Sequence, residues 1–349
     1  MQLYKLGKIP WQESQLIYHA LAHLGREALS LVSPATPYVC IGFHQDVEQE
    51  VDLDYCRAHD IPVFRRDLGG GAVYLDGNQL FYQVILRRDN PLVTQNKLAF
   101  YRTFLEPVVR TYRKIGIPAL YKPVNDVIAG TRKISGTGVA EIGGCVVFVG
   151  NLILDFDYDM MARVLKVPDE KFRDKVHKTL TDNLSTIRRE LSDQEAARWD
   201  EGGLNDLIAE EFGVLLGPMA AADKDPELQA KMDELAKRML SDEWLFRKGK
   251  PGVGRDIKIR AGVQVQHRMH KAPGGLIRAD LEIVEDRIGG VSISGDFFCY
   301  PGDAVARLEA ALEGVSLSDA ADVLGQFYAG GDVETPGIGI EDWLKVFGV

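Results

Sequence analysis

The sequence predicts an α+β fold in two parts. In the first part, strand-like runs precede a long helical region, and the order of strands followed by helices repeats after a stretch at 244–255 that is rich in Gly, Lys and Arg. Strands and helices that segregate in this way are typical of α+β domains and not of alternating βαβ units. A chain of 349 residues is long enough for one large and one small domain. We therefore expect domains at 1–245 and 256–349, joined by a linker at 246–255.

The composition is that of a globular protein and argues against several classes. Hydrophobic residues make up 46% and charged residues 26% of the chain, and the formal net charge is −10, which disfavours a nucleic-acid partner. The start lacks the apolar core of a signal peptide, and no apolar run reaches the roughly 18 residues of a membrane span. Four cysteines without a CxxC pair predict neither a zinc site nor a disulfide framework. We expect a cytoplasmic protein without membrane or nucleic-acid partners.

The apolar pattern predicts the first elements in order. Apolar residues recur at helical spacing over 10–31, which predicts an amphipathic helix, and run without interruption at 38–43, which predicts a buried strand. A short helix is expected at 53–59. A strand that begins at Val63 leads into a glycine run, and we expect 79–86 to pair back with it as a hairpin.

The rest of the larger part is mainly helical. A helix at 99–115 and a strand at 145–154 precede helices that extend over 158–240, with an exposed loop near 218–228. The smaller part should contain strands followed by two short helices, the strands lying near 257–265, 276–284 and 291–298.

A run of three glycines is the most informative motif of the chain. It reads RRDLGGGAVYLD, with two arginines before the glycines and a β-prone alternation after them. Consecutive glycines allow positive φ and bring backbone amides against a ligand without a Cβ atom in the way. Successive amides form an anion-binding concavity, and arginines can bind phosphate or carboxylate oxygens. The motif predicts a phosphate site or, alternatively, a glycine-rich hairpin with solvated arginines; its residues are Arg65, Arg66, Gly69, Gly70, Gly71, Ala72, Val73 and Tyr74.

A second motif surrounds Lys133. It reads KPVNDVIAGTRKISGTG and predicts a short strand at 127–128, a turn at 130–131 and extended structure from Lys133 onward. A lysine at the start of a strand is usually solvated, but the small residues here permit close backbone approach and favour contact with a bound anion. The other polar and small residues of this motif are Asn125, Asp126, Ser135, Gly136 and Gly138.

Together the two motifs resemble those of the lipoate–protein ligase family, within the larger group that also contains biotin ligases and octanoyltransferases. The resemblance continues over 150–191, where the lysines of a family loop are matched by Lys171 and Lys175. From about Lys258 to the end, the chain resembles the small accessory domain of such ligases, which some organisms encode as a separate polypeptide. The resemblance implies a large mixed-sheet catalytic domain of the biotin/lipoate ligase type and a small α+β accessory domain.

The resemblance also implies two half-reactions. Lipoate reacts with ATP to give the acyl-adenylate and pyrophosphate, and the amine of an acceptor lysine then attacks the adenylate. Both steps build negative charge on oxygens, which positioned donors and cations stabilise. We expect Lys133 to be the catalytic residue that bridges the substrate carboxylate and the α-phosphate, while Asp126 either holds Mg²⁺ or orients the incoming amine.

The remaining site residues follow from the same resemblance. Amides of the glycine run would bind phosphate or the acyl-adenylate, Arg65 or Arg66 would anchor an oxygen, and Asn125 would hydrogen-bond the adenylate. An apolar slot should bind the aliphatic chain, because each buried methylene contributes roughly 0.8 kcal/mol. Such a slot discriminates poorly between lipoate and octanoate. Its expected lining is Gly42, Phe43, His44 and Val139, beside Val73 and Tyr74.

Three alternatives to the ligase are considered. An octanoyl- or lipoyl-transferase works without ATP and needs an exposed, electropositive cysteine, but Cys40 lies in an apolar run and Cys145 begins one. The transferases place their cysteine just before 123–125 or after the strand that ends near Leu154, where this chain has none. A biotin ligase carries extra arginines and a tryptophan around its glycines. A non-catalytic acyl-binding protein would not need Lys133.

The chain departs from the family at two places that bear on its partner. Val124 stands where the best-known ligases commonly have arginine, and His44-Gln45 replaces another arginine. We expect the acceptor to be an apo lipoyl domain or a lipoate-binding protein, such as a glycine-cleavage-H-like protein or a carrier of sulfur metabolism.

Overall fold

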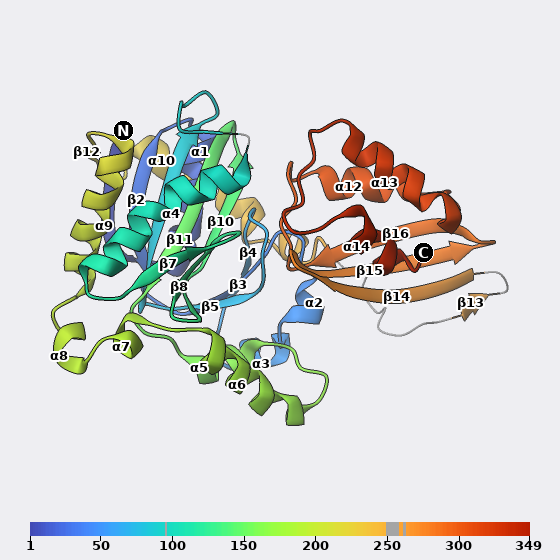
Figure 1. Ribbon diagram of the computed structural model, residues 1–349, viewed down its shortest axis with the longest axis horizontal. Coiled ribbons are helices and arrows are strands. Elements are labelled where there is room, and N and C mark those ends of the chain that lie inside the picture. Colours follow the sequence, from blue (N-terminus) through green and yellow to red (C-terminus); the bar gives the residue numbers. More distant parts are fainter. Residues whose placement is uncertain (95, 249–257, 261–262) are drawn as a thin grey trace. The chain divides into compact units, whose positions relative to one another are not determined.

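The computed structural model describes residues 1–94, 96–248, 258–260 and 263–349. The chain forms two compact units (Figure 1). The large unit comprises Met1–Cys40, Asp52–Phe64 and Val73–Ser241, and the small unit comprises Ile41–Val51, Arg65–Ala72 and Asp242–Val349. The expected boundaries at 245 and 256 stay a prediction, and most of the expected linker, 249–255, lies outside the described residues.

A six-stranded mixed sheet forms the centre of the large unit, as predicted for the fold class. Its order is β10-β11-β6-β2-β1-β12. Strand β1 pairs in parallel with β2 and β12, whereas β2, β6, β11 and β10 pair antiparallel. The strands span Gln2–Ile9 (β1), Ala28–Pro34 (β2), Gln79–Arg87 (β6), Thr137–Ile142 (β10), Cys145–Ile153 (β11) and Ala220–Ala221 (β12).

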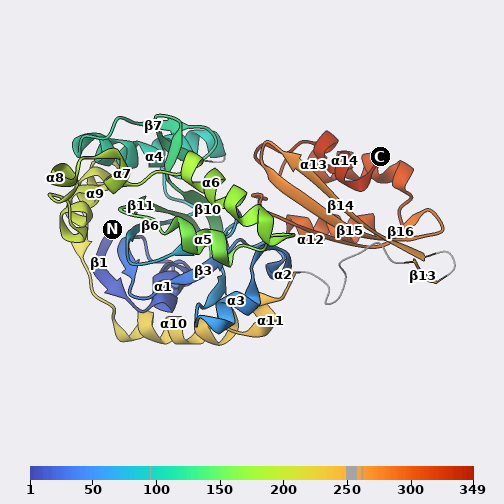
Figure 2. The ribbon, with the colours of Figure 1, turned by 90° about the horizontal axis from the view of Figure 1, so that it is seen from below.

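Helices cover both faces of this sheet. Figure 2 shows α1 and α10 on one face and α4 on the other. Helix α4 contains the expected apolar stripe, with buried Phe100, Phe104 and Tyr112. The longer helices are α1 (Trp11–His23), α4 (Lys97–Lys114), α9 (Glu201–Leu216) and α10 (Pro226–Met239), and the shorter ones are α2 (Val47–Glu50), α3 (Leu53–Ala58), α5 (Tyr158–Val164), α6 (Arg173–Asn183), α7 (Ile187–Glu190), α8 (Asp193–Ala196) and α11 (Asp242–Leu245).

Two predicted features of the large unit were wrong. The helix expected over 10–31 ends at His23, because Gly25 adopts a positive φ of 65° and the chain turns into strand β2. Every residue of β2 is buried, so its apolar positions continue the helical spacing only by coincidence. Strand β6 does not pair with the strands around the glycine run; it lies between β2 and β11, where all its residues except Arg87 are buried.

Two small three-stranded sheets carry the segments that the sequence singled out. One has the order β4-β3-β5, with β3 (Tyr38–Ile41) between β4 (Val63–Arg65) and β5 (Val73–Leu75). The other has the order β7-β8-β9, with β7 (Ala119–Lys122), β8 (Asp126–Ala129) and β9 (Arg132–Ser135). The predicted turn at 130–131 therefore lies between β8 and β9, and Gly130 there has a φ of 59°.

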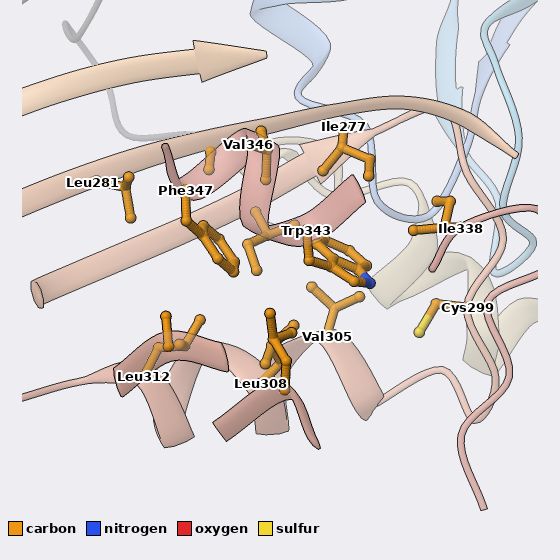
Figure 3. Packing of buried hydrophobic residues seen from close by; sticks show 14 of the residues in the cluster. Ile277, Leu281, Cys299, Val305, Leu308, Leu312, Ile338, Trp343, Val346 and Phe347 are labelled. Atoms are coloured by element: carbon orange, nitrogen blue, oxygen red, sulfur yellow. The ribbon is translucent and has the colours of Figure 1, made fainter. Parts of the chain in front are cut away.

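The small unit packs helices on one face of an antiparallel sheet of order β13-β14-β15-β16. In β15, buried residues alternate with half-buried ones, and Ile277 and Leu281 face a core that also contains Trp343 and Phe347 (Figure 3). Three α-helices follow the strands instead of the expected two. The elements are β13 (Lys258–Arg260), β14 (Val263–Ala272), β15 (Gly275–Val284), β16 (Arg287–Gly295), α12 (Ala304–Leu312), α13 (Ala320–Ala329) and α14 (Ile340–Phe347).

Across the described ranges, helices long and apolar enough to cross a membrane are absent.

Candidate functional site

Lys133 lies in the large unit at a fixed position on strand β9. Its Nζ atom is 2.6 Å from Oδ1 of Asp126 at the start of β8, and the two side chains are 37% and 27% exposed. Its carbonyl accepts a hydrogen bond of 2.8 Å from the amide of Ser185. The ammonium is thus accessible to a ligand while the main chain beneath it is held. This is the arrangement that a lysine acting on a bound anion requires.

Ser135 supports the lysine strand from inside the protein instead of facing a ligand. It is fully buried, its Oγ lies 2.9 Å from the Tyr82 hydroxyl, and it donates to the Asn151 carbonyl at 2.6 Å. The Asn151 side chain accepts from the Gly136 amide at 2.9 Å. These bonds join β9, β6 and β11. The Ser135 side chain thus has a structural role in this structure, and its expected place in the substrate site stays a prediction.

Sequence reasoning missed Gly150, which this network needs. A Cβ atom at Gly150 would overlap the hydroxyl and ring carbons of Tyr82, and Tyr82 is fully buried. Burial raises the pKa of Tyr82 well above its usual range, so the hydroxyl stays protonated for its bond to Ser135. The only sequence signal was the glycine within an otherwise apolar strand, which marks a close approach.

Asn125 and β10 complete the lysine region. The Asn125 amide group donates to the Thr137 carbonyl at 2.7 Å and so fixes the segment before β8 against β10. Gly138 and Val139 are buried residues of β10 that pair with β11. Tyr74, on β5 of the large unit, is also buried and donates its backbone amide to the Met161 sulfur at 3.1 Å.

The glycine run forms a close-packed loop in the small unit. Gly70 has a φ of 91°, and its amide donates to the Phe297 carbonyl at 3.2 Å. A Cβ atom at Gly69 would lie 2.5 Å from that carbonyl oxygen, and one at Gly42 would overlap the carbonyl of Gly70. The glycines thus permit close approach of main-chain carbonyls, and the expected approach of a ligand stays a prediction. In this structure the group that approaches is a distant part of the same chain.

The two arginines of the motif have different surroundings. Arg65 is fully buried and donates to the carbonyls of Gly42, Phe43, Gln45, Trp244 and Leu245. Burial, together with the charge of Arg247, lowers its pKa to about 10. In this structure the Arg65 guanidinium holds main-chain carbonyls, and the expectation that Arg65 or Arg66 anchors a ligand oxygen stays a prediction. Arg66 is half-buried and donates to the carbonyls of Gly69 and Gly71 at 2.8 and 2.9 Å, which shapes the loop.

His44 is a buried, neutral residue of the small unit. Its ring stacks on Phe297 with centroids 5.0 Å apart and meets Phe43 edge-on. Burial and the charges of Lys248, Arg247 and Arg65 lower its pKa to about 3. Of the expected acyl-pocket lining, Gly42, Phe43 and His44 belong to the small unit, whereas Val73, Tyr74 and Val139 belong to the large unit.

All four cysteines are buried. Burial raises the pKa of Cys56 to about 11 and of Cys299 to about 12, and it also raises the pKa of Cys145. A nucleophilic cysteine needs the opposite, an accessible thiolate with a lowered pKa. Groups of three or more side chains suited to hold a metal ion do not occur in the part of the chain that the structure describes.

The family follows from comparison with known proteins. A family model described as the lipoyl protein ligase A/B catalytic domain matches residues 11–202, and the chain belongs to this family. Lipoate-protein ligase A subunit 1 of Thermoplasma acidophilum is 38% identical over 159 residues, which cover 43% of this chain and 59% of that protein. Lipoate–protein ligase 1 of Staphylococcus aureus is 27% identical over 317 residues, covering 90% and 84% of the two chains. Octanoyltransferase LipM of Kyrpidia tusciae is 25% identical over 234 residues and covers 61% and 84%.

Solved structures agree with the family. The bipartite lipoate protein ligase of T. acidophilum, described with its E2 lipoyl domain, matches with a TM-score of 0.60 and 27% identity over 72% of this chain and 98% of that chain. A lipoate-protein ligase A bound with ATP matches with a TM-score of 0.55 and 25% identity, covering 70% and 98%. LipL1 of P. falciparum, at 15% identity, shares the fold over 99% of this chain and 97% of its own, with a TM-score of 0.68.

Proposed function

We propose that the protein is an AMP-forming lipoate–protein ligase. It activates lipoate or octanoate with ATP and transfers the acyl group to a lysine of an apo acceptor protein. The observation that carries this proposal is Lys133, whose ammonium is exposed and paired with Asp126 at 2.6 Å on a strand whose main chain is held. Family members described as ligases, one bound with ATP, support the same chemistry.

Lys133 contributes charge to the first half-reaction. When substrate arrives, its ammonium exchanges the Asp126 carboxylate for the substrate carboxylate and the α-phosphate. Two negatively charged groups are thereby brought together, and the negative charge that builds on the phosphate oxygens is stabilised. A compact ammonium with three donors can contact two oxygens at once.

Asp126 fits a role in Mg²⁺ binding. Mg²⁺ is usually held by one or two carboxylates together with substrate phosphates and waters. A single half-exposed carboxylate fits that pattern, and the described residues offer no group of three or more metal ligands. The bound ion would neutralise phosphate charge. The alternative role for the same carboxylate, once it is released from Lys133, is to orient the incoming amine.

The glycine loop is proposed to bind nucleotide phosphates through backbone amides. Gly70 already presents its amide to a carbonyl oxygen, that of Phe297, so its geometry suits an oxygen acceptor. Arg66, rather than Arg65, is the arginine proposed to assist, because Arg65 is fully buried among carbonyls. The acyl pocket expected from the sequence at Gly42, Phe43, His44 and Val139 stays a prediction.

The acceptor is proposed to be an apo lipoyl domain. A structural relative is described together with its E2 lipoyl domain, and a glycine-cleavage-H-like protein or a sulfur-metabolism carrier are the other candidates. Purified protein should be incubated with ATP, Mg²⁺, lipoate and these acceptors, and the acceptors analysed by intact mass. We expect one lipoyl group on one acceptor, and only with ATP.

A cysteine-dependent octanoyltransferase is the second candidate, because LipM proteins are among the relatives. The buried cysteines and the raised pKa of Cys145 oppose it. The same assay decides between the two functions. A ligase should keep its activity in Cys145→Ser, apart from a packing loss. ATP-independent transfer of octanoyl from a carrier protein, with a thioester trapped on a cysteine, would establish the transferase instead.

A further inference from the structure

One carboxylate joins two residues next to Lys133. Oε1 of Glu190, at the end of α7, accepts a hydrogen bond from Nη2 of Arg132 at 2.9 Å, and the Ser185 hydroxyl donates to the same oxygen. The Arg132 and Glu190 side chains are 33% and 15% exposed, and Ser185 is fully buried. A carboxylate that receives two such bonds, one of them from a cation, is held more firmly than a surface ion pair.

These bonds act on the backbone of Lys133 itself. Ser185 donates its amide to the Lys133 carbonyl at 2.8 Å, and Lys133 forms a parallel bridge with Leu184. Strand β9 is the edge strand of its sheet, and its register with β8 shifts beside Lys133, between Val127 and Ile128. Irregular pairing at an edge holds a strand less firmly than a regular ladder. Residues 184 and 185 therefore pair with the main chain of Lys133 on the side of β9 that does not pair with β8.

The geometry assigns Glu190 as a positioning residue for Lys133, an assignment that rests on the proposed function. Glu190 accepts hydrogen bonds from both Arg132 and Ser185. Arg132 precedes Lys133 in the chain, and Ser185 donates its amide to the Lys133 carbonyl. Side chains alternate across a strand, so the Arg132–Glu190 pair lies away from the face to which Lys133 projects. Glu190 thus fixes the lysine without competing for its ligand. Thr186, which caps α7 by accepting from the Arg189 amide at 3.1 Å, holds the helix that carries Glu190.

The test compares Glu190→Ala and Glu190→Gln with Arg188→Ala. Arg188 lies on the same helix and pairs with Asp155 at 3.0 Å, without a bond to the Lys133 strand. We expect Glu190→Ala to lower kcat of acyl-adenylate formation by roughly tenfold to a hundredfold, the loss typical of a misplaced catalytic group. KM for ATP and lipoate should change less than about twofold. Glu190→Gln, which keeps an acceptor oxygen for Ser185, should lose less, and Arg188→Ala should match the wild type.

Hydrogen exchange without substrate separates this inference from the proposed function. Exchange at the Ser185 amide should rise in Glu190→Ala and not in Arg188→Ala, whether or not the protein makes an acyl-adenylate. If faster exchange leaves kcat unchanged, or if exchange does not rise, the positioning role is overturned. The double variant Arg132→Ala/Glu190→Ala should lose no more kcat than either single variant, because the two residues act through one ion pair. We call the linked contacts of Arg132, Glu190 and Ser185 the Glu190 clamp. Additive losses of kcat in the double variant would contradict the positioning role. If Glu190→Ala does not fold, Ser185→Ala, which removes the hydroxyl that donates to Glu190, takes its place in the same measurements.

Discussion

Lys133 combines an accessible ammonium with a fixed main chain. Its Nζ is paired with Asp126 at 2.6 Å and remains 37% exposed, while Ser185 holds its carbonyl. A charge placed on a held strand needs little rearrangement when substrate binds, which is how positioned cations accelerate reactions. The contrast with Arg65 is instructive: that cation is fully buried and serves main-chain carbonyls. Exposure and hydrogen-bond partners therefore distinguish Lys133, the cation proposed to act on substrate, from Arg65, which holds the main chain.

Replacing Lys133 with Ala should abolish activity and spare the fold. We expect ATP–pyrophosphate exchange with lipoate to fall by about a thousandfold or more, because the main stabilising charge is removed. Lys133→Arg should recover little, since a planar fork cannot replace a compact ammonium between two oxygens. The unfolding free energy, measured by urea titration, should change little because the side chain is partly exposed. Exchange at the wild-type rate in Lys133→Ala would disprove the assignment.

At the scale of elements, three strands meet through one buried polar network. Tyr82 on β6, Ser135 on β9 and Asn151 on β11 are joined by hydrogen bonds of 2.9 and 2.6 Å. Gly150 allows the approach, because any side chain there would overlap Tyr82. The small sheet that carries Lys133 is thereby fastened to the central sheet. The position of this small sheet therefore depends on the close packing at Gly150. Adding atoms to a filled site of this kind is typically destabilising by about 1–3 kcal/mol.

Gly150→Ala should therefore destabilise the large unit and reduce activity. We expect the free energy of unfolding to fall by about 1–3 kcal/mol, together with a loss of kcat as β9 moves. Gly202→Ala is the matched control: a Cβ atom there lies at an ordinary 3.6 Å from Asp200 Oδ1, within helix α9. Alanine is the better helix former, so this control should be neutral or slightly stabilising. The free energies of unfolding of both variants are measured by urea titration. Equal values for Gly150→Ala and Gly202→Ala would contradict the packing argument.

At the scale of the whole molecule, the glycine loop depends on residues far along the chain. The small unit contains 41–51 and 65–72 together with everything after Ser241. Gly70 donates to the carbonyl of Phe297, and Arg65 donates to the carbonyls of Trp244 and Leu245. Helix α11 and the segment after β16 thus supply hydrogen-bond partners to the loop that is proposed to bind phosphate and to the arginine before it. Each of the two compact units is therefore built from segments that are separated in the sequence.

A protein that ends at Leu240 should lose lipoate activation and retain transfer. Without Phe297, Trp244 and Leu245, the glycine loop loses its acceptors and should bind ATP poorly, whereas Lys133 keeps its contacts within the large unit. We expect ATP–pyrophosphate exchange to fall by at least about a hundredfold, while presynthesised lipoyl-AMP still modifies the acceptor, as read by intact mass. Activation at the full rate would show that the loop does not need the C-terminal residues.

The sequence by itself determined the local features and the class. Turn residues placed the break at 130–131 and extended structure at Lys133, because Gly130 and its neighbours act through local φ and ψ preferences. The α+β class and a helix at 99–115 follow from apolar periodicity and the mixed sheet from the resemblance; the structure confirms the class and the sheet and has the helix at Lys97–Lys114. The glycine run permits close approach, since that property depends only on the missing Cβ atom, whereas its expected binding of phosphate stays a prediction.

Only the tertiary structure decided which group each polar residue meets. Periodicity extended the first helix to residue 31, where burial on both sides instead made strand β2. The pairing of β6, the burial of Arg65 and Ser135, and the bond from Gly70 to Phe297 all join segments that are far apart in sequence. Local propensity carries no information on such contacts, because they form only when hydrophobic packing brings distant segments together. For the same reason, the Glu190 clamp on Lys133 could be recognised only in the folded chain.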